Sequence, residues 1–153
     1  MTLLQENYRR VLEAVNLAAS EAKRTPGEVR LLAVSKTFPA EDIRTVFESG
    51  QIRFGENKVQ ELQAKVPVLP PEIEWHLIGH LQSNKAAKAV EFAHWIHSVD
   101  SVRLVEKIGS AAEKLNKKIK ILLEINISGE ESKFGLHSFD DAAPAAEAAL
   151  RHS

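Results

Sequence analysis

One lysine in this sequence stands where carbonyl chemistry could take place. The apolar run Leu31–Val34 predicts a short strand buried on both faces, as inside a parallel sheet, and Lys36 comes just after it. Pro39 suits the first turn of a helix, so Lys36 falls at a strand-to-helix junction, where barrel enzymes keep their chemistry. An ammonium that loses hydration against apolar walls gives up its proton more readily, and the free amine can attack a carbonyl. The other interpretation is a lysine that simply extends into solvent from a strand end.

Polar residues follow four further apolar runs in the same way. In chain order they are Glu56-Asn57, Gly79-His80, Asp100 and Asn126. The carboxyl ends of the strands in a parallel barrel share one face, so these residues and Lys36 can converge on one ligand. Any one of them alone is more often a helix cap or a turn residue. Together they favour a ligand-binding face.

The elements that must position these residues alternate regularly. Strands are expected near residues 31–35, 52–56, 74–78, 95–99 and 120–127, with helical patterns between them and a long amphipathic helix at 3–24. Such βα repetition requires parallel strands and right-handed crossovers, and its even spacing favours a (β/α) barrel over a doubly wound sheet. A complete barrel has eight strands in roughly 250 residues. The 153 residues therefore predict one partial α/β barrel domain, with about five of eight βα units.

Composition excludes several classes of function. The sequence is 44% hydrophobic and 27% charged with a net charge of −1, which is typical of a soluble globular domain. This balance gives no electrostatic argument for binding nucleic acid or an anionic membrane. Cysteine is absent from the sequence, which excludes disulfides, thiolate metal sites and a cysteine nucleophile. No signal peptide and no membrane span is recognisable, so a cytoplasmic location is expected.

The histidines do not have the spacing of a metal site. His76 and His80 are four residues apart, but in a strand-to-loop segment rather than on a helix. His94 and His97 are expected to point to opposite sides of a strand. A dinucleotide fingerprint, a Walker sequence and a serine nucleophile elbow are also absent from the sequence. We therefore predict no metal ligand and no nucleotide site.

Several segments, all in register, resemble the family of pyridoxal phosphate homeostasis proteins. They are Leu31–Thr37, Phe54–Glu61, Trp75–Lys85, His97–Ser101, Glu124–Glu130 and Lys133–Leu136. The resemblance covers nearly the whole chain and implies a TIM barrel of the alanine racemase N-terminal domain type. It also implies pyridoxal 5′-phosphate bound as a Schiff base to Lys36, with Asn57 close to the cofactor. The further pocket residues that it implies are Val34, Ile78, Gly79, His80 and Asn126.

The resemblance implies a protein that buffers or delivers pyridoxal phosphate, for example to apo-enzymes, without robust catalysis of its own. The alternative is an amino-acid racemase-like enzyme that uses the same cofactor. Racemisation needs a second acid or base on the opposite face of the substrate. The one tyrosine, Tyr8, falls in the predicted first helix. The carrier is therefore the favoured interpretation.

Members of the resembled family continue for roughly three more βα units, as an eight-stranded barrel requires. Those units include a segment that holds the cofactor phosphate and an arginine near the ring, which this sequence does not show. Weaker retention of the phosphate is expected as a result. Five strands also leave two open sheet edges. We therefore expect a homodimer or larger assembly that buries the fifth strand and residues 134–150.

Overall fold

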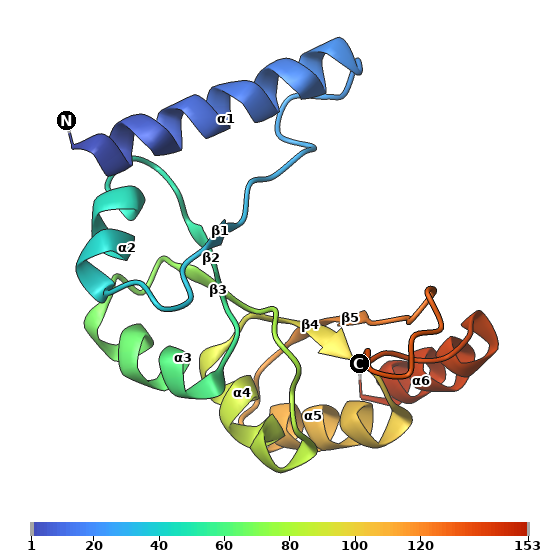
Figure 1. Cartoon of the computed structure of the whole chain (residues 1–153). Coiled ribbons are helices and arrows are strands. Elements are labelled where there is room, and N and C mark those ends of the chain that lie inside the picture. Colours follow the sequence, from blue (N-terminus) through green and yellow to red (C-terminus); the bar gives the residue numbers. More distant parts are fainter. Residues whose placement is uncertain (1, 153) are drawn as a thin grey trace.

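The computed structural model describes residues 2–152, and its centre is a five-stranded parallel sheet. The strands are β1 (Ala33–Val34), β2 (Arg53–Glu56), β3 (Glu74–Leu77), β4 (Trp95–Val99) and β5 (Lys120–Leu123), and they lie in sequence order. Every pairing between neighbours is parallel. The sheet curves into an open arc with helices along its outer side (Figure 1). The predicted partial (β/α) barrel is confirmed.

The helices alternate with the strands along the chain. They are α1 (Leu3–Glu21), α2 (Ala40–Phe47), α3 (Val59–Lys65), α4 (Ala86–Phe92), α5 (Val102–Lys114) and α6 (Phe139–Arg151), with short 3₁₀ turns η1 (Val66–Val68) and η2 (Ser83–Lys85). Side-chain oxygens of Thr2, Ser101 and Ser138 accept backbone N–H groups in the first turns of α1, α5 and α6. Such caps satisfy donors that a helix start leaves free. Within residues 2–152, no helix is long and apolar enough to cross a membrane.

The first helix is shorter than the predicted span of 3–24. Lys23 adopts a left-handed conformation with φ 55°. The amide of Arg24 donates to the carbonyl of Ala19 at 2.9 Å, and that of Lys23 donates to Ser20 at 2.9 Å. This is the pattern of a Schellman-type helix end. The helix therefore stops at Glu21 although the apolar spacing continues.

The prediction that β1 is buried on both faces is wrong. Val34 lies beside Gly55 in the register with β2, and its side chain is 48% exposed. Ala33 lies beside Phe54, which is 2% exposed. Neighbouring residues of a strand point to opposite faces, so Val34 points to the concave inner side of the arc. Five strands leave that side open, and the apolar run alone could not reveal this.

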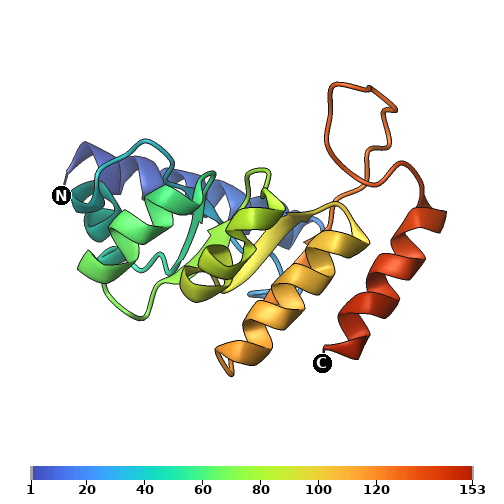
Figure 2. The same cartoon turned by 90° about the horizontal axis from the view of Figure 1, so that it is seen from below.

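The fifth strand ends at Leu123 rather than at residue 127. Beyond it, Ile125 forms an isolated parallel bridge with Leu136. The amide of Leu136 donates to the carbonyl of Glu124, and the amide of Asn126 donates to that of Leu136, each at 2.8 Å. The chain between them forms a loop that projects from the body beside α5 and α6 (Figure 2). Pairing within this loop therefore replaces the end of the predicted strand.

The two faces of the sheet differ in character. Phe54, Trp75, Leu77 and Ile96 share the face that packs with buried helix residues, and each is at most 2% exposed. The alternate residues point to the inner side and are largely polar. They are Arg53, Glu74, His76, Trp95, His97 and Lys120. The apolar core therefore lies between the sheet and the helices.

Candidate functional site

Lys36 lies in the turn that joins β1 to α2, at the carboxyl end of β1, and its side chain is exposed. Its near neighbours in the chain, Val34 and Phe38, are 48% and 54% exposed. Ser35 is buried, and Thr37 adopts a left-handed conformation with φ 68°. The turn thus presents an amine beside apolar surface at the mouth of the partial barrel.

The ends of β2 and β3 pack closely together next to this turn. A Cβ atom on Gly79 would overlap the backbone carbonyl of Asn57, so only glycine fits there. A Cβ atom on Gly55 would press on the side chains of Ile78, at 3.2 Å, and Leu32, at 3.5 Å. Gly55 is also the register partner of Val34. The structure thus gathers four of the predicted pocket residues, Val34, Asn57, Ile78 and Gly79, around the ends of the first three strands.

His80 belongs to a second group, at the ends of β3 to β5. Its ring stacks on Phe134, with centroids 3.6 Å apart and planes 12° apart. Its Nδ1 lies 3.6 Å from Oδ2 of Asp100. This arrangement ties the loop after β5 to the segments that follow β3 and β4. An aromatic wall results at the carboxyl ends of these strands.

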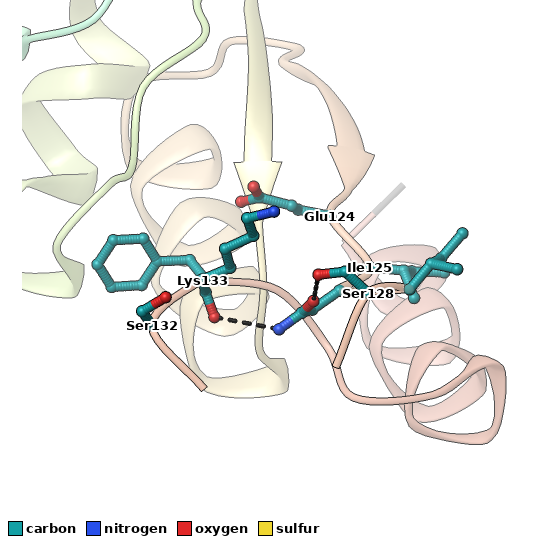
Figure 3. A pocket seen from close by; sticks show the side chains of 8 residues that line it. Glu124, Ile125, Ser128, Ser132 and Lys133 are labelled. Atoms are coloured by element: carbon teal, nitrogen blue, oxygen red, sulfur yellow. Dashed lines mark hydrogen bonds between the residues drawn. The ribbon is translucent and has the colours of Figure 1, made fainter. Parts of the chain in front are cut away.

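Asn126 is buried and organises the loop that follows β5. Its Nδ2 donates to the carbonyls of Glu130, at 2.8 Å, and Lys133, at 3.3 Å. Its Oδ1 accepts the Ser128 hydroxyl and the Gly129 amide. A cavity of about 360 Å³ opens here, and Figure 3 shows its lining side chains. Since the loop already engages the Asn126 amide, this residue shapes the cavity wall, and its contact with a cofactor stays a prediction.

Glu56 does not point to the mouth, contrary to the expectation from its place at the end of an apolar run. Its side chain is fully buried on the helix-facing side of β2. Its Oε1 accepts the Ser35 hydroxyl and the Lys65 ammonium, each at 2.7 Å. Burial raises the pKa of the Glu56 carboxyl, while the hydrogen bonds from Lys65 and Ser35 oppose that rise. This carboxyl therefore belongs to a buried ion network behind the turn.

The inner face carries a row of polar side chains that sequence reasoning missed. His76 Nδ1 lies 2.9 Å from Nε2 of His97, and its Nε2 lies 3.0 Å from Glu74. The His76 ring stacks on Trp95 with centroids 5.7 Å apart. Burial lowers the pKa of His76 to about 4, against the opposing hydrogen bond to Glu74. Among residues 2–152, no three histidine, aspartate or glutamate side chains are arranged to hold a metal ion.

Two signals in the sequence could have found these clusters. Glu61 and Lys65 are four residues apart on an expected helix, which is the spacing of an ion pair. Residues 74 and 76 alternate with apolar Trp75 and Leu77, which indicates one polar face of a strand. Placing His76 beside Trp95 requires the register between β3 and β4. That register comes only from the structure.

The model of the alanine racemase N-terminal domain family matches residues 7–153. The pyridoxal phosphate homeostasis protein of Escherichia coli K12 is 37% identical over 140 residues, which cover 89% of this chain and 60% of that protein. The human protein of the same name is 42% identical over 140 residues, covering 82% of this chain and 51% of the relative. The chain thus spans about three fifths of the bacterial relative's length. The resemblance to pyridoxal phosphate homeostasis proteins is confirmed.

Solved structures agree with this assignment. PipY of Synechococcus elongatus, determined without PLP, superposes with a TM-score of 0.75 at 43% identity, over 86% of this chain and 62% of PipY. The same protein with PLP bound gives 0.70 at 41% identity, over 85% and 60% of the two chains. Alanine racemase of Streptomyces coelicolor is 22% identical, with a TM-score of 0.73 over 97% of this chain and 37% of the racemase, and supports the fold alone. The chain therefore belongs to the family of the alanine racemase N-terminal domain.

Proposed function

We propose that this chain binds pyridoxal 5′-phosphate as a Schiff base on Lys36 and takes part in the homeostasis of that cofactor. The observation that most strongly supports this proposal is the exposed Lys36 amine at the carboxyl end of β1, beside the apolar surface of Val34. The free amine adds to the aldehyde carbon, a C=N bond forms, and the carbonyl oxygen leaves as water. Relatives named as pyridoxal phosphate homeostasis proteins support the proposal, as does PipY with PLP bound.

The residues around Lys36 fit an aromatic carbonyl compound. The half-exposed Val34 and the partly buried Ile78 offer apolar surface for a ring on the inner side of β1 to β3. Asn57 supplies an amide that can accept or donate a hydrogen bond at the end of β2. Gly79 lets the segment that follows β3 lie close to the backbone of Asn57. His80 and Asn126 lie further round the mouth, and we propose that they bound the pocket on that side.

We also propose that the chain carries the cofactor, and hands it to apo-enzymes, without robust catalysis of its own. A racemase-like reaction needs a second proton-transfer group opposite the lysine. Tyr8 is buried in α1, its hydroxyl donates to Oε1 of Gln51 at 3.4 Å, and burial raises its pKa. A tyrosine held in this way is a poor base. The names of the relatives, which describe homeostasis, support the same conclusion.

Borohydride trapping tests the carrier proposal. The full chain is mixed with pyridoxal 5′-phosphate, its absorbance spectrum is recorded, and the adduct is reduced and mapped by peptide mass spectrometry. We expect the pyridoxyl group on Lys36 and its loss in Lys36→Ala, while Lys58→Ala and Lys85→Ala leave the absorbance unchanged. An adduct spread over several surface lysines would overturn the proposal.

Isotope exchange separates the carrier from the racemase-like enzyme. The loaded protein is incubated with alanine in deuterated water, and the Cα position is followed by NMR. We expect no deuterium uptake beyond that of free cofactor. Incorporation at an enzyme-like rate that Lys36→Ala abolishes would favour the racemase-like alternative.

We further propose that this chain associates with copies of itself. The outer edges of β1 and β5 have no neighbouring strand among residues 2–152. Large apolar side chains near the β5 edge are exposed, including Leu122 at 45%, Phe139 at 72% and Leu150 at 73%. Open edges with apolar surface promote pairing between chains. Light scattering during size exclusion should show a dimer or larger species, and a folded monomer at micromolar concentration would refute this.

A further inference from the structure

One buried lysine holds the backbone on both sides of Lys36. Lys65, in the last turn of α3, donates from Nζ to the backbone carbonyl of Ser35 at 3.0 Å and to Oε2 of Glu61 at 2.9 Å. The same Glu61 oxygen accepts the backbone amide of Thr37 at 2.8 Å. The residues before and after Lys36 are thus tied to one ion pair. The side chain of Lys36 itself is exposed.

This ion network lies behind the turn. Lys65 and Glu56 are 8% and 0% exposed, and they meet on the helix-facing side of β2. A ligand at the mouth of the barrel would contact the opposite side of the turn. Lys65 can therefore affect Lys36 only through the backbone that it holds.

The backbone conformation of Thr37 shows why the turn around Lys36 needs stabilising contacts. Its φ of 68° is in the left-handed region, which a β-branched residue adopts at a cost of roughly 1–3 kcal/mol. A conformation of this kind persists only where its surroundings impose it. Besides the turn hydrogen bond from the Phe38 amide to the Ser35 carbonyl at 3.2 Å, the hydrogen bond from the Thr37 amide to Glu61 fixes this backbone. It thereby sets the direction in which the chain leaves Lys36.

Charge keeps the network in place. Burial lowers the pKa of Lys65, but its hydrogen bonds to Glu56 and Glu61 outweigh burial and raise that pKa overall. Burial also raises the pKa of Glu61, and the hydrogen bonds from Lys65 and from the Thr37 amide bring it below its ordinary value. The ammonium and the Glu61 carboxylate are therefore ionised at neutral pH. Charge-assisted hydrogen bonds are shorter and stronger than neutral ones.

We propose that Glu61 and Lys65 are positioning residues for Lys36: by fixing the Thr37 amide and the Ser35 carbonyl, they aim the Lys36 amine into the mouth of the barrel. This inference rests on the proposed function of Lys36 as the amine that binds pyridoxal 5′-phosphate. It adds two residues that never contact the cofactor but control how fast it is captured.

The test uses the full chain and three variants of Glu61, whose side chain is 22% exposed and tolerates substitution better than the buried Lys65. Glu61→Gln keeps an acceptor for the Thr37 amide, Glu61→Leu removes it, and Glu61→Asp shortens its reach. Each protein is mixed with pyridoxal 5′-phosphate, reduced with borohydride at timed intervals and mapped by peptide mass spectrometry. Loss of alignment should slow capture at Lys36 by about 10- to 100-fold in Glu61→Leu and Glu61→Asp, with the smallest loss in Glu61→Gln, which keeps the acceptor but not the charge.

Two readouts separate positioning from a general structural role. Modification of the partly buried Lys85, measured in the same samples, should keep its rate in every variant. Hydrogen exchange without cofactor should show a faster Thr37 amide in Glu61→Leu and a protected one in Glu61→Gln. Capture at the parental rate in both Glu61→Leu and Glu61→Asp, or an equal loss at Lys85, would overturn the positioning role alone. A parent chain that gives no adduct on Lys36 would overturn the proposed function and this inference with it.

Discussion

Two polar clusters on opposite faces of the same sheet hold buried bases whose pKa values shift in opposite directions, although burial by itself lowers both. On the helix-facing side, Lys65 keeps its charge, and its pKa is raised because two carboxylates outweigh burial. On the inner side, His76 is about equally buried, yet burial lowers its pKa to about 4. Its carboxylate partner Glu74 is shared with Arg53, at 3.3 Å, and the neighbouring His97 and Arg53 lower the pKa of His76 further. The carboxylates around each base therefore account for the opposite directions of the two pKa shifts, in addition to the higher ordinary pKa of lysine.

Removing Lys65, the charged base on the helix-facing side, should have the largest effect on stability. Lys65→Met leaves Glu56, which is fully buried, without its cation, and breaking a buried pair in this way costs about 3–5 kcal/mol. Urea denaturation followed by circular dichroism measures this loss. The matched control is Lys88→Met, which removes an exposed ion pair with Glu91 at 2.8 Å and should cost less than about 1 kcal/mol.

A double variant tests whether the unpaired Glu56 carboxylate causes the loss of stability in Lys65→Met. If the loss in Lys65→Met comes from the unpaired Glu56 carboxylate, then adding Glu56→Leu should restore much of the stability, because a well-packed apolar pair can replace a buried ion pair. A double variant as unstable as Lys65→Met would show that packing around Lys65 causes the loss. The distinction matters for Ser35, whose hydroxyl and carbonyl both join this network.

His76, the neutral base on the inner face, should make the stability of the fold sensitive to acid. His76 has an ordinary pKa of 6.5 and a folded-state pKa of about 4, so the unfolded chain takes up the proton first as the pH falls. Stability is therefore full above pH 6.5 and declines towards pH 4, by roughly 3 kcal/mol. Burial lowers the pKa of His94 and His97 as well, which adds to the decline.

Urea denaturation at several pH values measures this decline, and His76→Gln should flatten it. The pKa of His152 is shifted in the opposite direction, because hydrogen bonds to Glu106 and Glu113 raise it. Its contribution is present at low pH and is lost as the pH rises through the raised value. His152→Gln should therefore leave the acid decline in place. An unchanged decline in His76→Gln would contradict the assignment to the inner face.

The sequence predicted the strands and their order better than it predicted the burial and contacts of individual side chains. The five parallel strands and their order follow from apolar runs at even spacing, which is a local signal. The exposure of Val34 does not, because it depends on whether other strands cover the inner face. Glu56 was expected at the mouth, yet it is the last residue of β2 and turns toward Lys65, nine residues away. A difference of one position along a strand reverses the face.

The residues of the candidate site show the same difference between local sequence signals and tertiary contacts. Lys36, Asn57 and Gly79 could be placed at the strand ends, because parallel strands bring their carboxyl ends to one edge. The support behind Lys36 could not, since the contact of Thr37 with Glu61 crosses 24 residues and depends on a left-handed backbone at Thr37. Sequence patterns therefore located Lys36 at a strand end and left the orientation of its side chain to tertiary structure.

The smallest effect should come from the outer end of the inner-face cluster. The ammonium of Lys120 lies 4.9 Å from the centroid of the Trp95 ring, which also contacts the stacked His76 and the edge of His97. Lys120 is exposed, so this cation–π contact should contribute about 0.5–1 kcal/mol. Lys120→Met should lower the free energy of unfolding by that amount, against less than about 0.5 kcal/mol for Lys118→Met, two residues earlier and also exposed. A loss as large as that of Lys65→Met would show that both faces hold their cations equally firmly, and it would contradict the difference between them.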